Sequence, residues 1–464
     1  MAKNLYEEKA SYVGTAMASQ QKRIPIGAVI AAVAVIALVV VGLAVYFLAP
    51  KPPEKVKLTL FTKAGLWADF IRDSGAIERF KERMLRERNI EVEVEILTAP
   101  HAGYSDKLIT TLAAGTVLDV IWVSPDRIPD MVEAGYLLDL TPYVEKWGDW
   151  AKFYKANKDM VTYKGRVYAV PHDAAIVIIY YRKDLFEKAG LPVPWQPRTW
   201  TDVLEAAKIV MEKIPEVKAG LSPYYGGEIH IPIYAAGGTI YDPADGKFIV
   251  KSKAVLFLFK VYYDAFYTYG VAPREMILEK WDTRKLFQEG KLAILIDGTW
   301  CYTEKWGPGM TYEIPNREEV IGYAYIPGSG MPGAPDYLVA VRDYSWAIGA
   351  KSENPELAFE LIKELVSPDI MADWGYKTSH LVARSDAVIG DYAKDAFLKW
   401  NTEAMERYGV AKPVVAGTSK YLSILKEIVE KELVYAGKTP EECMEAFASA
   451  AAAKLGANAV KEAP

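Results

Sequence analysis

LDVIWV, at residues 118–123, is a continuous apolar run of the kind that a central strand of a parallel sheet requires. Two strand candidates precede it: KLTLFT (57–62) and VEVEIL (92–97), the second alternating with the period of a half-buried strand. Between them, residues 69–88 have helical spacing, and residues 104–115 predict a helix that ends at a glycine. This β-α-β-α-β order predicts an α/β fold with an open sheet, and such sheets bind ligands beyond the carboxyl ends of their strands.

The remainder of the chain is richer in helix signals. Residues that can cap a helix precede several apolar segments, and these residues are Thr199, Ser252, Asp282, Asn354 and Thr439. The chain has 464 residues, and the part after residue 50 is too long to share one core. We therefore expect two lobes.

Composition excludes several classes of protein. With 55 basic and 60 acidic side chains, the net charge is -5, which argues against nucleic acid as a partner. Two cysteines, Cys301 and Cys443, cannot form a disulfide framework, although the sequence leaves open whether they pair with each other. The four histidines lack metal-ligand spacing, so no metal or cofactor is expected. Abundant Lys and Glu with few amides favour a thermophilic source.

Motifs of catalysis are missing as well. The sequence contains no glycine-rich nucleotide-binding loop, no G-x-S-x-G elbow and no H-E-x-x-H motif. Acidic pairs suited to a glycosidase can be drawn, but 60 acidic residues make chance pairs unavoidable. The sequence therefore predicts a protein that is not an enzyme.

One segment predicts a membrane anchor. Residues 24–49 carry no charge over 26 positions, whereas about 20 apolar residues span a bilayer. The run is longer than the apolar region of a secretory signal peptide, and no cysteine for a lipid anchor follows it. Lys22 and Arg23 precede it, which places residues 1–23 in the cytoplasm and everything after residue 50 outside the cell. Residues 50–56 are a proline-rich linker.

Aromatic side chains recur beside polar ones where predicted strands end. A pyranose ring has an apolar C–H face that flat aromatic rings cover and hydroxyl groups that carboxylates bind. A single aromatic at such a position is more often part of the core, so the set as a whole carries the argument. Its members are Trp67, Trp122 near Asp126, Tyr168 near Asp173, Tyr225 near Glu228, Trp300, and the pair Tyr344 and Trp346.

Several motifs, in order along residues 57–460, resemble the family 1 extracellular solute-binding proteins of ABC importers, which include maltose-binding protein. The clearest is YYRKDLFEKAGL (180–191) followed by PRTWTDVLEAAK (197–208), although Arg182 replaces the asparagine usual in this family. The other matching stretches are LAAGTVLDVIWV (112–123), MVEAGYLLDLTPYV (131–144), KGRVYAVP (164–171), FQEGKLAILIDGTW (287–300) and SENPELAFELIKELVSPD (352–369).

The resemblance implies a two-lobe binding-protein fold with hinge crossovers near residues 174–179, 292–297 and 339–344. It implies an N-lobe of residues 57–173 and 295–340, and a C-lobe of residues 178–290 and 346–460. The ligand-facing positions that it implies are Trp67, Asp126, Asp173, Trp300 and Trp346, with Tyr225 and Glu228 as weaker candidates.

We therefore expect a membrane-anchored extracellular receptor that captures a sugar or oligosaccharide and delivers it to the permease subunits of an ABC importer. Relatives in the family also bind polyol phosphates, but the sequence places no basic cluster in the cleft that would hold a phosphate. A surface protein used for assembly and a glycan-acting enzyme remain the alternatives. The sequence does not identify the sugar.

Overall fold

The computed structural model describes residues 25–48, 51–223 and 228–463, and it divides into a unit up to Glu54 and a unit from Lys55 onward. The first unit contains helix α1 (Ile26–Leu48), whose side chains are described only as far as residue 41. Over the residues that the structure describes, no helix is both long and apolar enough to cross a membrane. The tail at 1–23 lies outside the described residues.

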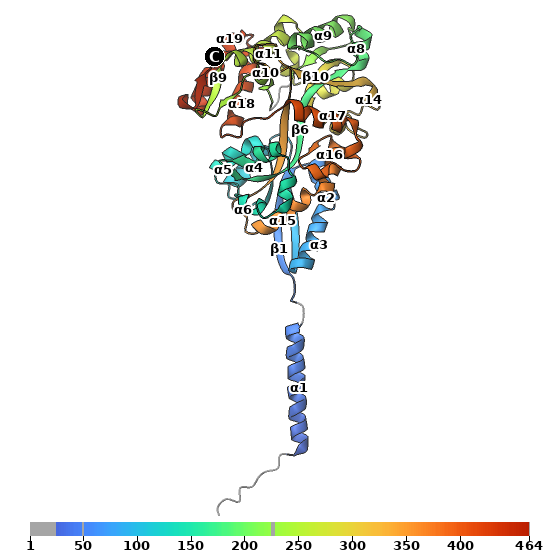
Figure 1. The fold of residues 1–464 in the computed structure, drawn as a ribbon, viewed down its shortest axis with the longest axis vertical. Helices are drawn as coiled ribbons and strands as arrows, with labels where there is room; N and C mark the ends of the chain where they lie inside the picture. The colour runs from blue at the N-terminus through green and yellow to red at the C-terminus, as the bar shows by residue number, and fades with distance from the viewer. Residues whose placement is uncertain (1–24, 49–50, 224–227, 464) are drawn as a thin grey trace, which may run out of the picture. The chain divides into compact units, whose positions relative to one another are not determined.

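The second unit is built around one large mixed sheet (Figure 1). Its main path runs β2-β1-β3-β13-β6-β10-β7, and four short strands pair with β6 or β13 beside this path. The strands of the sheet are β1 (Glu54–Lys63), β2 (Ile90–Ala99), β3 (Val120–Val123), β6 (Ala169–Arg182), β7 (Ala219–Ser222), β10 (Leu292–Gly298), β11 (Ile321–Ala324), β12 (Ile326–Pro327), β13 (Tyr337–Ile348), β14 (Leu381–Val382) and β15 (Gly409–Val410). Two smaller sheets pair β4 (Thr162–Tyr163) with β5 (Arg166–Val167), and β16 (Val460–Glu462) with β9 (Lys247–Lys251) and β8 (Tyr241–Asp242).

The first lobe confirms the strand order predicted from the sequence. β1 and β3 are parallel, with Leu60 opposite Val120, and every residue of β3 is buried. The helix expected over 69–88 is broken in two, because Gly75 adopts φ 77° between the halves. The helices of this lobe are α2 (Leu66–Asp73), α3 (Ala76–Arg88), α4 (Tyr104–Ala113), α5 (Ile128–Glu133), α6 (Thr141–Val144), α7 (Lys155–Met160), α15 (Pro355–Leu365) and α16 (Pro368–Thr378).

The second lobe packs most of its helices around β6, β10 and β7. Thr199 and Thr439 cap their helices through reciprocal bonds with Asp202 and Glu442, as the sequence predicts. Its helices are α8 (Lys183–Ala189), α9 (Trp200–Lys213), α10 (Ile231–Ala235), α11 (Lys253–Tyr263), α12 (Glu275–Leu278), α13 (Thr283–Gln288), α14 (Arg317–Val320), α18 (Thr418–Ile428) and α19 (Pro440–Leu455), and α17 (Ala396–Tyr408) lies at the junction of the lobes.

Two long strands belong to both lobes. The first part of β6 lies in the first hydrophobic core and its later part in the second, while β13 pairs with β6 over residues 340–347 and also with β3 over residues 345–348. These strands are the crossovers expected near 174–179 and 339–344. The crossover expected at 292–297 is wrong, because β10 pairs only with β6 and β7 and stays in the second lobe.

The predicted lobe boundaries need a matching correction. Residues 295–340 pack mainly in the second lobe rather than the first, because β10, β11 and β12 all pair there. The end of β13 returns to β3, so residues 346–398 lie mainly in the first lobe rather than the second. The chain reaches the second lobe again between α17 and α18.

Candidate functional site

Two neighbouring cavities lie where the lobes meet. One of about 250 Å³ lies against the first lobe, and one of about 270 Å³ is lined from both lobes. They share His101, Arg342 and Tyr344, and together they fall within the roughly 300–1,000 Å³ of small-molecule sites. We refer to the two cavities as the cleft. A third cavity of about 590 Å³ adjoins at Arg284 but is lined by the second lobe, and Pro223 on its rim precedes residues outside the described chain.

The first lobe contributes residues from the ends of β1 and β2, the edge where an open sheet binds ligands. Lys63 is the last residue of β1, and Trp67 follows it in the first turn of α2. The Trp67 ring stacks on His101, with ring centroids 5.3 Å apart, and the Lys63 Nζ lies 4.7 Å from the Trp67 ring. These contacts place a half-buried indole in the wall of the cleft.

The hinge strand β13 and the segment after β10 form the opposite wall. Tyr344 and Arg342 come from β13, and the guanidinium of Arg342 lies 5.0 Å from the Trp300 ring. Trp300 is half-buried and lines the cavity together with Glu304 and Lys305 from the short helical turn η4 (Cys301–Lys305). Indole rings from both walls therefore border one space.

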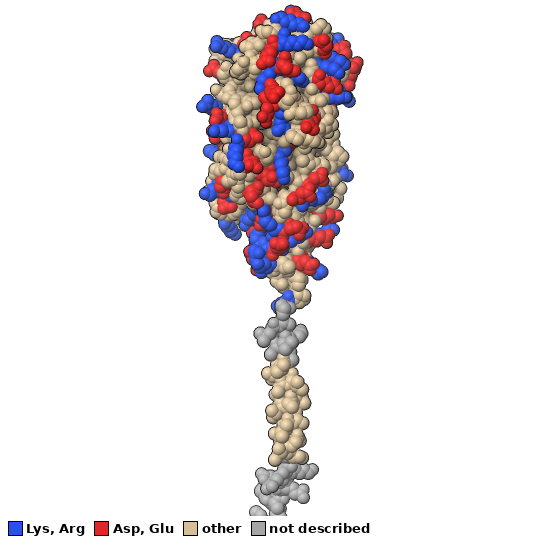
Figure 2. All heavy atoms as spheres, turned by 90° about the vertical axis from the view of Figure 1, so that its right-hand side faces the viewer, with Lys and Arg blue, Asp and Glu red and all other residues tan. Residues whose placement is uncertain are grey.

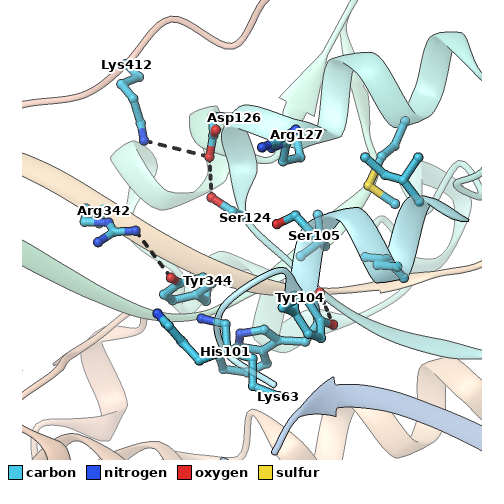
Figure 3. Close-up of a pocket in the computed structure, with 15 residues that line it drawn as sticks. Lys63, His101, Tyr104, Ser105, Ser124, Asp126, Arg127, Arg342, Tyr344 and Lys412 are labelled. Atoms are coloured by element: carbon cyan, nitrogen blue, oxygen red, sulfur yellow. Dashed lines mark hydrogen bonds and ion pairs between the residues drawn. The ribbon is translucent and has the colours of Figure 1, made fainter. Parts of the chain in front are cut away.

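Alternating charges line one side of the cleft, and Figure 3 shows Lys412 beside Asp126 there. Lys412 Nζ lies 3.0 Å from Glu228 Oε1 and 3.8 Å from Asp126 Oδ1, while Arg342 Nε lies 3.1 Å from Glu228 Oε1. Ser419, from the second lobe, donates a 2.7 Å bond to Asp126, in the first. Burial opposes the ionisation of both carboxyls, but these cations outweigh it, so the pKa values of Asp126 and Glu228 lie below their usual range.

Asp173 lies deeper, on β6. It is 1% exposed and accepts a 2.6 Å hydrogen bond from the indole nitrogen of Trp374. Burial raises its pKa to about 7. Asp173 does not line either cavity of the cleft, so it supports the site from behind.

The seven residues predicted from the sequence fall into four groups. Trp67, Trp300 and Asp126 line the cleft, and Glu228 lies behind it as the fully buried partner of Arg342 and Lys412. Asp173 and Trp346 are buried. Tyr225 lies outside the described residues.

Trp346 requires a correction. It is 0% exposed, its ring centroid is 4.5 Å from that of Trp122, and its indole nitrogen donates to His172. Stacking on a sugar needs an open ring face, and Trp346 lies in the first-lobe core instead.

The basic side chains of the cleft were not predicted. Lys63, Arg284, Arg342 and Lys412 come from four separate segments, so no run of sequence indicates that they meet. Of the aromatic lining outside the seven predicted residues, Tyr344 and Trp122 belong to the aromatic set that the sequence indicates. In the described part of the chain, no group of His, Cys, Asp and Glu is placed to hold a metal ion, and Cys301 and Cys443 are free and buried.

Comparisons with known proteins agree with this architecture. The sequence profile of the family described as bacterial extracellular solute-binding protein matches residues 67–372, more than half of the chain. The lactose-binding protein of Rhizobium radiobacter is 25% identical over 300 residues, covering 61% of this chain and 67% of that protein. The GacH receptor of Streptomyces glaucescens, solved unliganded and with acarbose, is similar with a TM-score of 0.70 at 18% identity, covering 86% of this chain and 98% of that chain. The ABC substrate-binding protein Lmo0181 of Listeria monocytogenes, solved with cycloalternan, is similar with a TM-score of 0.70 at 20% identity, and the match covers 87% of this chain and 99% of that chain.

The chain therefore belongs to the bacterial extracellular solute-binding protein family. Its two-lobe α/β fold is that of the sugar-binding structures with which it compares. The relatives are binding proteins rather than enzymes, which confirms the prediction that this chain is not an enzyme.

Proposed function

We propose that this protein is the membrane-anchored, extracellular substrate-binding component of an ABC importer and that it captures a sugar or oligosaccharide in the cleft. The observation that carries the proposal is the pair of indoles, Trp67 and Trp300, bordering one cavity together with charged hydrogen-bonding groups. The names of its relatives support the same class, since they are a lactose-binding protein and an ABC substrate-binding protein solved with cycloalternan.

The geometry suits a pyranose. The half-buried rings of Trp67 and Trp300 offer flat apolar surfaces to the C–H faces of sugar rings. Arg342 offers a charged donor and Glu304 a carboxyl group to the hydroxyls, and hydrogen bonds to charged groups are the stronger kind. A sugar would thus be held by stacking and by polar contacts at its rim.

The two-lobed framework provides for closure around the ligand. The lobes are joined through β6 and β13 and through the chain between α17 and α18, which is few enough connections for a hinge. The walls of the cleft come from both lobes, so closure would bring Trp67 and Trp300 onto the same ligand.

The membrane anchor is a separate part of the proposal, and it is inferred mainly from the sequence. Residues 24–49 are free of charge, and α1 carries exposed apolar side chains such as Ile30, Val33 and Ile36. An anchored receptor has a raised effective concentration at its permease without any new contact. Detergent phase partition tests this part: the full chain should enter the detergent phase, and a chain that begins at residue 51 should stay in the aqueous phase.

Thermal unfolding of the full chain in a mild detergent tests the binding function. A sugar present at a hundred times its dissociation constant stabilises the folded state by about 2.7 kcal/mol. We expect such a shift with at least one oligosaccharide, and we expect the sugar to be recovered unchanged. Recovery of a cleaved glycan would instead identify an enzyme, and a broad panel without any shift would exclude sugar as the ligand.

A further inference from the structure

Lys63 is a buried cation that faces the cleft. It is 3% exposed and lines the first cavity, where its Nζ lies 3.8 Å from the Tyr344 ring (Figure 3). Among the residues that the structure describes, no acceptor completes a hydrogen bond to Lys63 Nζ, and its close contacts are with the rings of Tyr344 and Trp67. Burying an uncompensated charge is unfavourable, and proteins normally pair such groups.

The carboxyl groups near Lys63 do not fill this role. Burial raises the pKa of Asp173 and of Glu304 to about 7, so a large fraction of each is neutral near physiological pH. Asp173 already accepts a hydrogen bond from Trp374. Both carboxyl groups also lie within 4 Å of His380, but burial lowers the pKa of His380 to about 3, so this histidine is neutral and adds no positive charge. Neither carboxyl is paired directly with the ammonium group of Lys63, whose contacts are with the rings of Tyr344 and Trp67.

The charges of Lys63 and Arg342 act on two neighbouring side chains. The pKa of His101 falls to about 4 because of partial burial and the charges of Lys63 and Arg342. Burial alone would raise the pKa of Tyr344, yet Arg342 and Lys63 lower it overall. A lowered pKa on a tyrosine in a crowded site requires a strong positive field.

The face of the molecule shown in Figure 2 has no patch of basic side chains alone. On the face shown in Figure 2, basic and acidic side chains are interspersed. Within the cleft, Arg342 and Lys412 are balanced by Glu228 and Asp126, and Arg284 pairs with Asp297 at 2.8 Å. Lys63 is the most deeply buried of the cleft cations that form no ion pair, since Arg127 and Lys305, which also line the cleft, are partly exposed.

We propose that the cleft binds an acidic sugar, and that the ammonium group of Lys63 receives the negative charge of this ligand. The inference rests on the proposed function, because it names the class of sugar. A singly charged group, such as the carboxylate of a uronic acid, matches the single buried ammonium group of Lys63 better than a phosphate dianion does. The neighbouring rings of Trp67 and Tyr344 would then contact the apolar face of the same sugar.

Binding to paired ligands tests the inference. We would titrate the full chain in detergent with di- and trisaccharides of galacturonate, glucuronate and mannuronate, each beside its methyl ester, which has the same ring but no charge. Maltotriose and glucose 6-phosphate would represent neutral and phosphorylated sugars. We expect at least one acid to bind about 10- to 100-fold more tightly than its ester, as charge-assisted hydrogen bonds allow.

Two variants assign the charge to its site. Lys63→Met keeps the length of the side chain and should remove the preference for the acid, whereas Lys399→Met, at an exposed position outside the cleft, should retain it. Unliganded Lys63→Met should melt close to the wild type, because the desolvation cost that the change removes offsets the lost cation–π contacts with Tyr344 and Trp67. This melting temperature also shows that the variant is folded.

The outcomes separate the inference from the proposed function. Maltotriose or an ester that binds as tightly as the acids would overturn the inference and leave sugar binding intact. Tight binding of glucose 6-phosphate that depends on Lys63 would uphold the anionic requirement and identify phosphate as its source. Retention of the acid preference in Lys63→Met would overturn the role of Lys63, and binding of no sugar at all would overturn both proposals.

Discussion

Lys412 Nζ lies 3.0 Å from Oε1 of Glu228, a carboxylate with no exposed surface. Asp126 of the first lobe lies 3.8 Å from the same ammonium group. Glu228 and Asp126 are more than 100 residues apart in the sequence, so this lysine joins segments of both lobes. The ion pair of Lys412 and Glu228 thus both shapes the cleft and contributes to the stability of the folded protein.

Replacing Glu228 by Gln should destabilise the protein. The change leaves Arg342 and Lys412 facing each other without their shared counter-charge, and breaking a buried pair costs roughly 3–5 kcal/mol. Lys412 and Arg342 retain 12% and 22% exposure, so we expect a loss of about 2–3 kcal/mol in the free energy of unfolding. Urea titration measures it, with exposed Glu353→Gln as the matched control. Equal stability of the two variants would show that the network contributes little.

Replacing Gly298 by Ala should weaken sugar binding. A Cβ atom at this position would lie 1.9 Å from Cζ3 of Trp300, so the indole must leave its place in the cleft wall. Overpacking of this kind costs about 1–3 kcal/mol, and we expect a loss of affinity of at least about tenfold from the displaced ring. Titration of the bound sugar by tryptophan fluorescence checks the affinity. Gly148→Ala, where the added atom meets nothing within 4 Å, should bind as the wild type does.

The sequence predicted elements whose signals are local. β1, α4 and β3 follow from apolar runs and periodicity within a few residues, and the cap at Thr199 follows from its own motif. The lobe boundaries could not be predicted in the same way. They depend on which strands pair over long distances, and β13 contacts both β6 and β3 along a single strand.

Candidate site residues show the same division. Alternation along a strand places Tyr344 and Trp346 on one face, and both contact the Trp122 ring. The sequence does not indicate depth, and only Tyr344 reaches the cleft while Trp346 stays in the core. Lys63 sits in an apolar strand end, and its contacts with the rings of Tyr344 and Trp67 become visible only when the other segments are in place.

Trp346→Ala should therefore mainly reduce stability, whereas Trp67→Ala should mainly reduce sugar affinity. Trp346→Ala opens a cavity in the core and should lower the free energy of unfolding by about 3–5 kcal/mol. Trp67→Ala removes a half-buried ring and should cost less stability while reducing sugar affinity about tenfold, the equivalent of about 1.4 kcal/mol. Chemical denaturation and binding titration of both variants measure the contrast. If Trp346→Ala instead keeps its stability but no longer binds the sugar, Trp346 contacts the ligand and is not a core residue.

Asp173 should impose a dependence of stability on pH. Because burial raises its pKa to about 7 in the folded state, the folded protein binds this proton more tightly than the unfolded chain does. The contribution of Asp173 to stability is therefore lost as the pH rises from about 4 to about 7, and it is constant above that window.

Asp173→Asn isolates this contribution, because the amide stays neutral and its oxygen can still accept the bond from Trp374. Relative to the wild type, the variant should gain stability between pH 4 and pH 8, by an amount on the order of 2–4 kcal/mol. Urea titrations at several pH values give the difference curve, and exposed Asp73→Asn should give a flat one. Four histidines have pKa values lowered by burial and oppose this trend in the absolute stability, but they are common to both proteins and cancel in the difference. A difference that stays constant from pH 4 to pH 8 would mean that Asp173 is ionised throughout, in which case it would serve as a counter-charge for Lys63.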